Sequence, residues 1–173
     1  MADIGIMSYP KNDRIVAVEP WRSEKMVFVC HPSHRLATRP MIFAADISGE
    51  NFIAFDGDLP IRKAIDRSLK HHHSQVNVVM EFDNIETMKQ AIEINAGVSI
   101  LPEPTVRRSA DGKRMVAILL SMPELVRPVG IIHRRQKPLT PTVQRFIQLL
   151  QSAGEPLPAP TKTPSNASAI AVT

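Results

Sequence analysis

The sequence predicts a mixed α/β fold, and three observations support that class. Short runs rich in Val, Ile and Phe recur along the chain as candidate strands, and between some of them apolar residues recur at helical spacing. This strand–helix alternation in the middle of the chain requires a parallel sheet with right-handed crossovers. With 173 residues, 43% of them hydrophobic and 22% charged, the chain has room for one domain or two small lobes.

The N-terminal third is predicted to consist of strands. Residues 3–7 (DIGIM) are typical of a short buried strand, and residues 14–18 alternate as a second one. Residues 25–31 (KMVFVCH) are the strongest signal of a buried strand, because Val and Phe dominate them. After a turn-rich segment, residues 51–55 (NFIAF) are the next strand.

Two helices are predicted in the middle of the chain. Asp58 is the expected N-cap of the first helix, which has Pro60 in its first turn and runs into the histidine triplet at 71–73. A strand at residues 76–82 precedes the second helix. Asp83 and Glu86 form its capping-box-like start, and Gly97 is expected to end it at the C′ position. The apolar stripes are Ile61, Ala64, Ile65 and Leu69 in the first helix and Ile85, Met88, Ala91 and Ile92 in the second.

The C-terminal third is predicted to add strands at residues 98–101, 113–120 and 128–133 and a last helix that starts at Thr140-Pro141. The apolar face of that helix comprises Val143, Phe146, Ile147 and Leu150. Residues 154–173 contain four prolines, no aromatic residue and two charged residues. Such a segment cannot bury enough apolar surface to offset chain entropy, so a disordered tail is predicted.

Composition excludes several classes of protein. A single cysteine, Cys30, excludes a disulfide framework and a cysteine zinc site. Lys and Arg exceed Asp and Glu, 21 against 17, but scattered charges and 5% aromatic residues favour a solvated surface over a nucleic-acid interface. No uncharged stretch approaches the roughly 18 residues of a membrane span, and the first residues lack the basic region of a secretory signal. A cytoplasmic protein with no membrane partner is therefore expected.

Five segments, in this order, resemble the effector-binding domain of LysR-type transcriptional regulators. They are DIGIM, KMVFVCHPSHRLA, NFIAF, EFDNIETMKQAIEINAGVSILP and RPVGIIHRR, followed by a terminal helix. The most specific is residues 81–102, because that family ends a helix with small-Gly-x-x-hydrophobic-Leu-Pro, which residues 96–102 match as AGVSILP. Residues 31–37 (HPSHRLA) resemble the family's turn after its first crossing strand, but Arg35 stands where the family usually has proline.

The resemblance implies a fold like type 2 periplasmic binding proteins, in which two α/β lobes are joined by two crossing strands. The expected parts are a partial first lobe (1–24 and 134–153), crossing strands (25–31 and 128–133), a complete second lobe (32–119) and a connection (120–127). The first lobe is expected to lack its opening strands and helices, and the family's winged helix-turn-helix has no counterpart. We therefore expect a truncated regulator that reaches DNA only through a partner. The apolar side of residues 3–7 would be exposed, which invites homo-oligomerisation.

The same resemblance implies a site for a small-molecule effector between the lobes. Carried over by position, its ligand-binding residues are Ser8 and Tyr9 from the first lobe and Phe55, Asp56, Gly57, Asp58, Asn84 and Ile85 from the second. The alternative roles are helix caps for Asp58 and Asp83 and a turn for Gly57. Because Asp56 and Asp58 would repel an anion, a neutral or amine-bearing effector is expected.

The predicted function is thus effector sensing in the regulation of transcription, and the alternative is a solute-binding protein of a transporter. No enzyme activity and no cofactor are predicted, since the sequence has no GxSxG, HExxH, GxGxxG or P-loop pattern. Consecutive residues point about 100° apart on a helix, so His71, His72 and His73 are not expected to converge on a metal ion. Cys30 lies in an apolar strand and is expected to be a buried, inert thiol.

Overall fold

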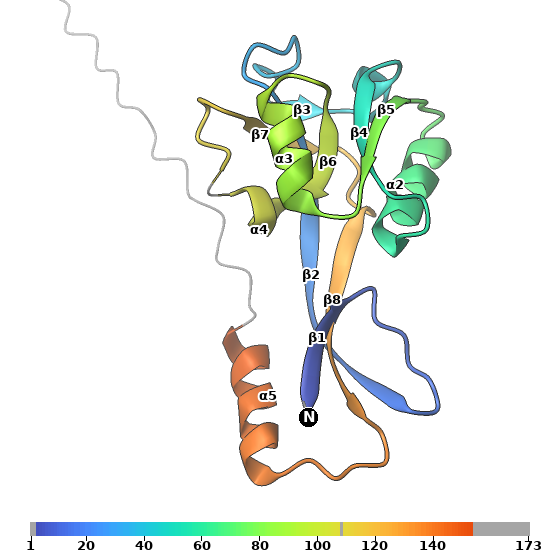
Figure 1. The fold of residues 1–173 in the computed structure, drawn as a ribbon, viewed down its shortest axis with the longest axis vertical. Helices are drawn as coiled ribbons and strands as arrows, with labels where there is room; N and C mark the ends of the chain where they lie inside the picture. The colour runs from blue at the N-terminus through green and yellow to red at the C-terminus, as the bar shows by residue number, and fades with distance from the viewer. Residues whose placement is uncertain (1–2, 108, 154–173) are drawn as a thin grey trace, which may run out of the picture.

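The computed structural model describes residues 3–107 and 109–153 (Figure 1), so the predicted tail at 154–173 lies outside the described residues. The strands are β1 (Ile4–Ser8), β2 (Val16–Cys30), β3 (Met41–Ile42), β4 (Asn51–Phe55), β5 (Asn77–Phe82), β6 (Ser99–Pro102), β7 (Val116–Leu120) and β8 (Val126–Arg134). The helices are α1 (Ala44–Ile47), α2 (Pro60–His71), α3 (Ile85–Glu93), α4 (Glu103–Val106) and α5 (Pro141–Ala153). The sequence did not predict the short elements β3, α1 and α4.

Strand β2 belongs to two sheets. Its first part, up to Lys25, pairs antiparallel with β8, and from Met26 onward it pairs with β6 on one side and β7 on the other. The sequence predicted two separate strands here, which was wrong. Pro20 has no amide to donate, yet the strand passes it because the β2–β8 register shifts between Pro20 and Arg22.

From Met26 onward, β2 belongs to what we call the large sheet, whose strands run in the order β5-β4-β6-β2-β7-β3. The backbone amide of Ile53 donates to the Val98 carbonyl and that of Val98 to the Asn51 carbonyl, both at 2.8 Å, which joins β4 to β6. The pairs β4–β5 and β3–β7 are parallel, as strand–helix alternation predicts, but β2 pairs antiparallel with both of its neighbours. The sheet is therefore mixed, because β2 enters it from outside the alternating segment.

A second, small sheet consists of β1, β8 and the first part of β2, all antiparallel. Helix α5 lies along this end of the molecule (Figure 1), where Ile147 is buried and Trp21 Nε1 donates to the Leu150 carbonyl at 2.6 Å. The expectation that residues 3–7 form a buried strand was wrong, since Ile6 and Met7 are 55% and 47% exposed. The other expectation for this strand, that its apolar side is exposed because part of the first lobe is lacking, agrees with these values.

The helix ends correct three sequence predictions. The N-cap of α2 is Leu59, without a side-chain cap, so Asp58 does not cap it. Helix α3 is capped by Asn84, whose Oδ1 accepts from the Thr87 amide at 2.9 Å, one residue later than the predicted Asp83. Asn95, with φ of 59°, takes the left-handed position after α3 that was expected of Gly97.

Gly97 is needed for a different reason. A Cβ at this position would lie 2.6 Å from the Asn51 carbonyl oxygen, closer than real Cβ atoms come. Glycine therefore permits the close backbone approach that joins β4 to β6.

Candidate functional site

A cleft of about 400 Å³ lies where the small sheet meets the large one, a volume that suits a small molecule. It opens at the carboxyl ends of the parallel strands β4 and β5, where α/β proteins commonly bind ligands. The starts of α2 and α3 reach its wall, and the first amides of a helix have no partner within the helix. The residues lining it are Ser8, Tyr9, Phe55, Leu59, Pro60, Ile61, Asp83, Asn84, Ile85, Glu86 and Arg127.

The structure brings five of the eight residues proposed from the sequence to this cleft. These five are Ser8, Tyr9, Phe55, Asn84 and Ile85. Asp56, Gly57 and Asp58 are not among the lining residues; Gly57 and Asp58 are exposed in the turn before α2. That these residues bind a ligand stays a prediction.

Arg127 is the lining residue that sequence reasoning missed most clearly. It lies opposite Glu24 in the β2–β8 ladder, and its Nε donates to Glu24 Oε2 at 2.7 Å. Glu24 is only 4% exposed, and its other oxygen pairs with Arg22 Nη2 at 2.6 Å. The buried Glu24 carboxylate is thus held between two guanidiniums. This pairing orients Arg127 toward the cleft, and the negative charge of Glu24 offsets the positive charge of Arg127. The sequence did hold one signal for Arg127, because a charged residue stands between Val126 and Pro128 at the start of an apolar strand.

Tyr9 is fixed by the same strand. Its amide donates to the Pro128 carbonyl at 2.8 Å and its hydroxyl donates to the Val126 carbonyl at 3.4 Å. Tyr9 therefore binds β8 at the residues on either side of Arg127. Its φ of 52° is unusual for a bulky residue. Burial raises the pKa of the Tyr9 hydroxyl and the nearby Arg127 charge opposes this, so the phenol stays protonated and able to donate.

The opposite wall carries the polar groups of the α3 start. Asn84 Oδ1 is used by the helix cap, while its Nδ2 donates to Asp83 Oδ1 at 3.1 Å. Asp83 and Glu86 add two carboxylates, and Glu86 pairs with Lys89 at 2.8 Å. The cleft therefore combines acceptors at the start of α3 on one wall with the Arg127 guanidinium, which pairs with Glu24, on the other.

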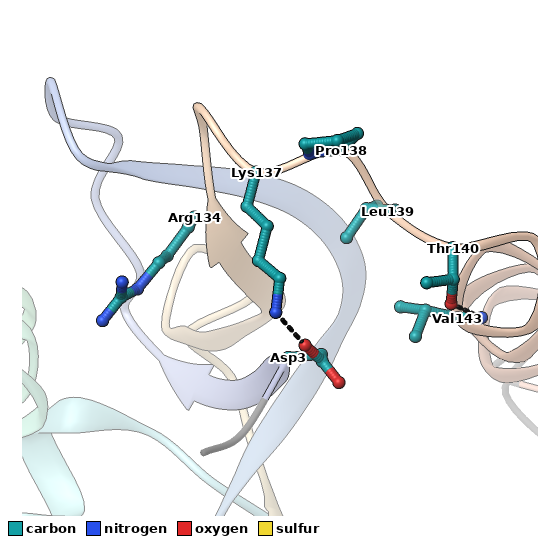
Figure 2. A pocket seen from close by; sticks show the side chains of 7 residues that line it. All are labelled: Asp3, Arg134, Lys137, Pro138, Leu139, Thr140 and Val143. Carbon is teal, nitrogen blue, oxygen red and sulfur yellow. Dashed lines mark hydrogen bonds and ion pairs between the residues drawn. The ribbon is translucent and has the colours of Figure 1, made fainter.

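A smaller hollow lies near the start of α5 (Figure 2). It has room for about 10 Å³ and is bordered by the ion pair between Lys137 Nζ and Asp3 Oδ1, which are 2.5 Å apart. A space of that size holds no more than a water molecule. We assign it no ligand.

The single thiol does not contribute chemistry to the cleft. Cys30 is fully buried at the end of β2, and burial raises the pKa of its thiol to about 11, with the Glu50 charge acting in the same direction. A protonated, enclosed thiol is unreactive, as the sequence predicted. Separately, no helix in the described ranges has the length and apolarity needed to cross a membrane.

Comparison with known proteins adds a family and a set of neighbours. Residues 1–155 match the family model described as LysR substrate binding domain. The HTH-type transcriptional regulator YeiE of Escherichia coli (strain K12) is 25% identical over 154 residues, which cover 89% of this chain and 52% of that protein. The chain thus spans about half the length of the curated relatives it matches.

Solved structures show the same fold. The CcmR regulatory domain of Synechocystis PCC6803, solved in complex with 2-PG, superposes with a TM-score of 0.77 at 23% identity, covering 91% of this chain and 76% of that one. The effector binding domain of QuiR, solved in complex with shikimate, gives a TM-score of 0.75 at 19% identity, covering 88% and 71%. The two sheets and the shared β2 therefore form the two-lobe architecture that the sequence resemblance implied. The precise lobe boundaries stay a prediction.

Proposed function

Because this chain belongs to the LysR substrate binding domain family, we propose that it is the effector-sensing part of a transcriptional regulator. The proposed event is the binding of a small molecule in the cleft between the two sheets. The observation that carries the proposal is the composition of the cleft wall, which takes residues from both sheets. A ligand that touches both walls favours one relative arrangement of them over others, and that preference is what a sensor transmits.

Two chain segments link the walls. Strand β2 runs from the small sheet into the large one at Lys25–Met26, and residues 121–125 connect β7 of the large sheet to β8 of the small one. Such links at element ends are typical hinges for closure around a ligand. Arg127 and Tyr9 lie directly beside the second link, so a ligand contact there acts on the hinge.

We propose a neutral or amine-bearing effector. The sequence favoured this ligand class because Asp56 and Asp58 would repel an anion, but neither residue lines the cleft. Asp83 and Glu86 do line it, and the one guanidinium on the wall is paired with Glu24. Because Lys89 offsets Glu86, Asp83 is the lining carboxylate without an ion pair among the described residues, and its negative charge attracts an amine.

Calorimetric titration with matched panels of small amines, neutral polyols and carboxylates tests the ligand class. Amines are expected to bind most tightly, and Asp83→Asn should weaken them most. Preferential binding of carboxylates would count against this class while leaving the sensing proposal intact.

A cleft-filling variant tests the sensing proposal itself. Ile85→Trp, on the cleft wall, should abolish binding of whichever ligand the panels identify. Ile94→Trp is the control, because Ile94 is 76% exposed at the C-cap of the same helix. Equal binding by wild type and Ile85→Trp would place the ligand elsewhere and refute the proposed site.

The remaining properties proposed here concern the whole regulator. We propose that the domain acts in the cytoplasm, has no catalytic activity, and affects DNA only through a helix-turn-helix supplied outside the described residues. A homo-oligomer fits the exposed apolar residues Ile6 and Met7 of β1. The family match favours this regulator over the alternative of a transporter's solute-binding protein.

A further inference from the structure

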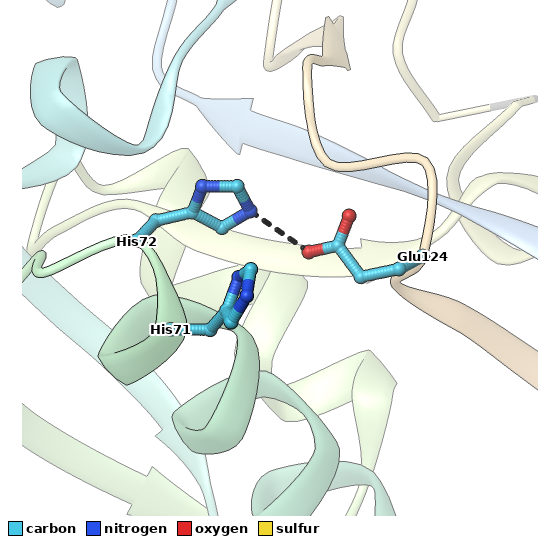
Figure 3. A group of neighbouring side chains, drawn as sticks. All are labelled: His71, His72 and Glu124. Atoms are coloured by element: carbon cyan, nitrogen blue, oxygen red, sulfur yellow. Dashed lines mark hydrogen bonds and ion pairs between the residues drawn. The ribbon is translucent and has the colours of Figure 1, made fainter.

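Helix α2 ends beside the loop that connects β7 to β8, and two imidazoles face a carboxylate there (Figure 3). His71 is the last residue of α2, His72 is its C-cap, and Glu124 lies in the loop. One possible ligand atom from each of the three side chains lies within 4.8 Å of the other two. All three residues are exposed, so an ion can enter from solvent without any rearrangement of the fold.

The expectation that neighbouring histidines cannot converge was wrong for this pair. It assumed ideal helical geometry, in which adjacent side chains diverge. His72 instead has φ of −90° and ψ of 13°, and His73 is left-handed with φ of 54°. As the backbone leaves the helix, the rings of His71 and His72 come to 5.0 Å between centroids at 90° to each other, and both face Glu124.

Glu124 is held in position by groups outside the triad. Ser68 Oγ donates to Glu124 Oε1 at 2.6 Å, and Ser68 itself is only 5% exposed, so its hydroxyl is a fixed donor. His72 Nε2 lies 2.9 Å from the same oxygen. Outer hydrogen bonds of this kind orient the carboxylate ligands of metal sites.

The donor set and the spacing both suit a transition metal. Two imidazole nitrogens and one carboxylate oxygen are the protein ligands of open, tetrahedral zinc sites. Bond lengths of about 2.0–2.2 Å place tetrahedral ligand atoms roughly 3.3 Å apart. The observed separations, 2.9 Å for His72–Glu124 and no more than 4.8 Å for the set, are close enough for rotations of exposed side chains to complete the geometry.

We propose that His71, His72 and Glu124 bind a divalent transition-metal ion such as zinc, with solvent in the remaining position. The ion ties the end of α2 to the β7–β8 loop. Three residues after Glu124 the chain reaches Arg127 on the cleft wall, so the ion restrains the link between the two sheets. This proposal does not depend on the identity of an effector.

The test is a zinc chloride titration of the full chain after removal of metals by a chelator. Wild type is compared with His71→Ala, Glu124→Gln and the matched control His73→Ala, which removes the adjacent imidazole that is not part of the triad. Wild type and the control should bind one ion per chain with equal affinity, and the two triad variants should bind at least about tenfold more weakly. Circular dichroism confirms that the variants are folded.

Cobalt(II) supplies a second readout, because tetrahedral coordination by nitrogen and oxygen gives intense visible absorption bands that the triad variants should lose. An unchanged affinity in Glu124→Gln would overturn the proposal, since the carboxylate would then not be a ligand. An equal loss in His73→Ala and His71→Ala would also overturn it, because the histidine run alone would then account for binding.

Discussion

The large sheet and the small sheet contain strands of similar apolar character, but only the large sheet carries the main hydrophobic core. Every residue of the main hydrophobic core lies between Met26 and Leu125, in the large sheet, its helices and the loops that join them. In the small-sheet region the buried apolar residues are Val129, Ile131 and Ile147 among those described. Nearby, Ile6, Met7, Phe146 and Leu149 are each about half exposed, at 55%, 47%, 50% and 55%.

The difference shows that apolar sequence and apolar burial are separate quantities. Burial stabilises a fold roughly in proportion to the area removed from water, so stability should be concentrated in the large-sheet region. The small-sheet region instead depends on a few specific contacts, of which the Glu24–Arg127 pair is the most enclosed.

The largest expected effect is that of Phe28→Ala in β2. Phe28 is fully buried in the large sheet, so its truncation leaves a cavity and should lower the free energy of unfolding by about 4 kcal/mol. Phe146→Ala is the same change on α5, at a half-exposed position, and should cost less than about 1 kcal/mol. Urea unfolding followed by circular dichroism measures both. Equal losses would show that the two regions are equally well packed.

The second prediction concerns the ion cluster in the small sheet. Arg127→Ala leaves the buried Glu24 carboxylate with Arg22 as its one cationic partner among the described residues, and we expect a loss of about 3 kcal/mol. Arg107→Ala removes an exposed pair with Glu103 and serves as the control, with an expected loss of about 0.5 kcal/mol or less. If the two variants lose the same amount, the enclosed pair does not hold the small sheet in place.

The third prediction is a pH dependence that arises at the large-sheet end of β2. The pKa of Cys30 is raised from 9.0 to about 11 in the folded chain, so above about pH 9 the unfolded state releases the proton first. The protonated thiol therefore contributes to the free energy of unfolding below pH 9, and this contribution is lost as the pH rises. At pH 11 the loss should reach about 2 kcal/mol. The measurement is the difference in unfolding free energy between wild type and Cys30→Ala across this range. A difference that stays constant with pH would contradict the burial of the thiol.

Much of the large-sheet region could be predicted from local sequence. The stripes of α2 and α3 and the parallel pair β4–β5 follow from periodicity, which reports the face that each element buries. The AGVSILP segment also carried the resemblance to the family, and the structure shows that its glycine is required where β4 meets β6. These features depend on residues close together in the chain.

The features that were missed depend on distant residues or on the last turn of a helix. Arg127 reaches the cleft because it pairs with Glu24, 103 positions away, and no local pattern encodes that contact. The strand break expected before residue 25 did not occur because a register shift accommodates Pro20. The convergence of His71 and His72 followed from a non-helical C-cap, a conformation that the histidine run does not specify.

The smallest expected effect is at the start of α3, where the large-sheet core borders the cleft. Asn84→Ala removes the oxygen that accepts from the Thr87 amide and should destabilise the chain by about 1 kcal/mol. Asp83→Ala, one residue earlier, should change stability by no more than about 0.5 kcal/mol, because the Asp83 side chain accepts from Asn84 Nδ2, an exposed contact, while Asn84 caps the helix amide. Urea unfolding of the two variants decides between the observed cap and the one that the sequence suggested. A larger loss for Asp83→Ala would move the start of α3 back by one residue and alter which amides face the cleft.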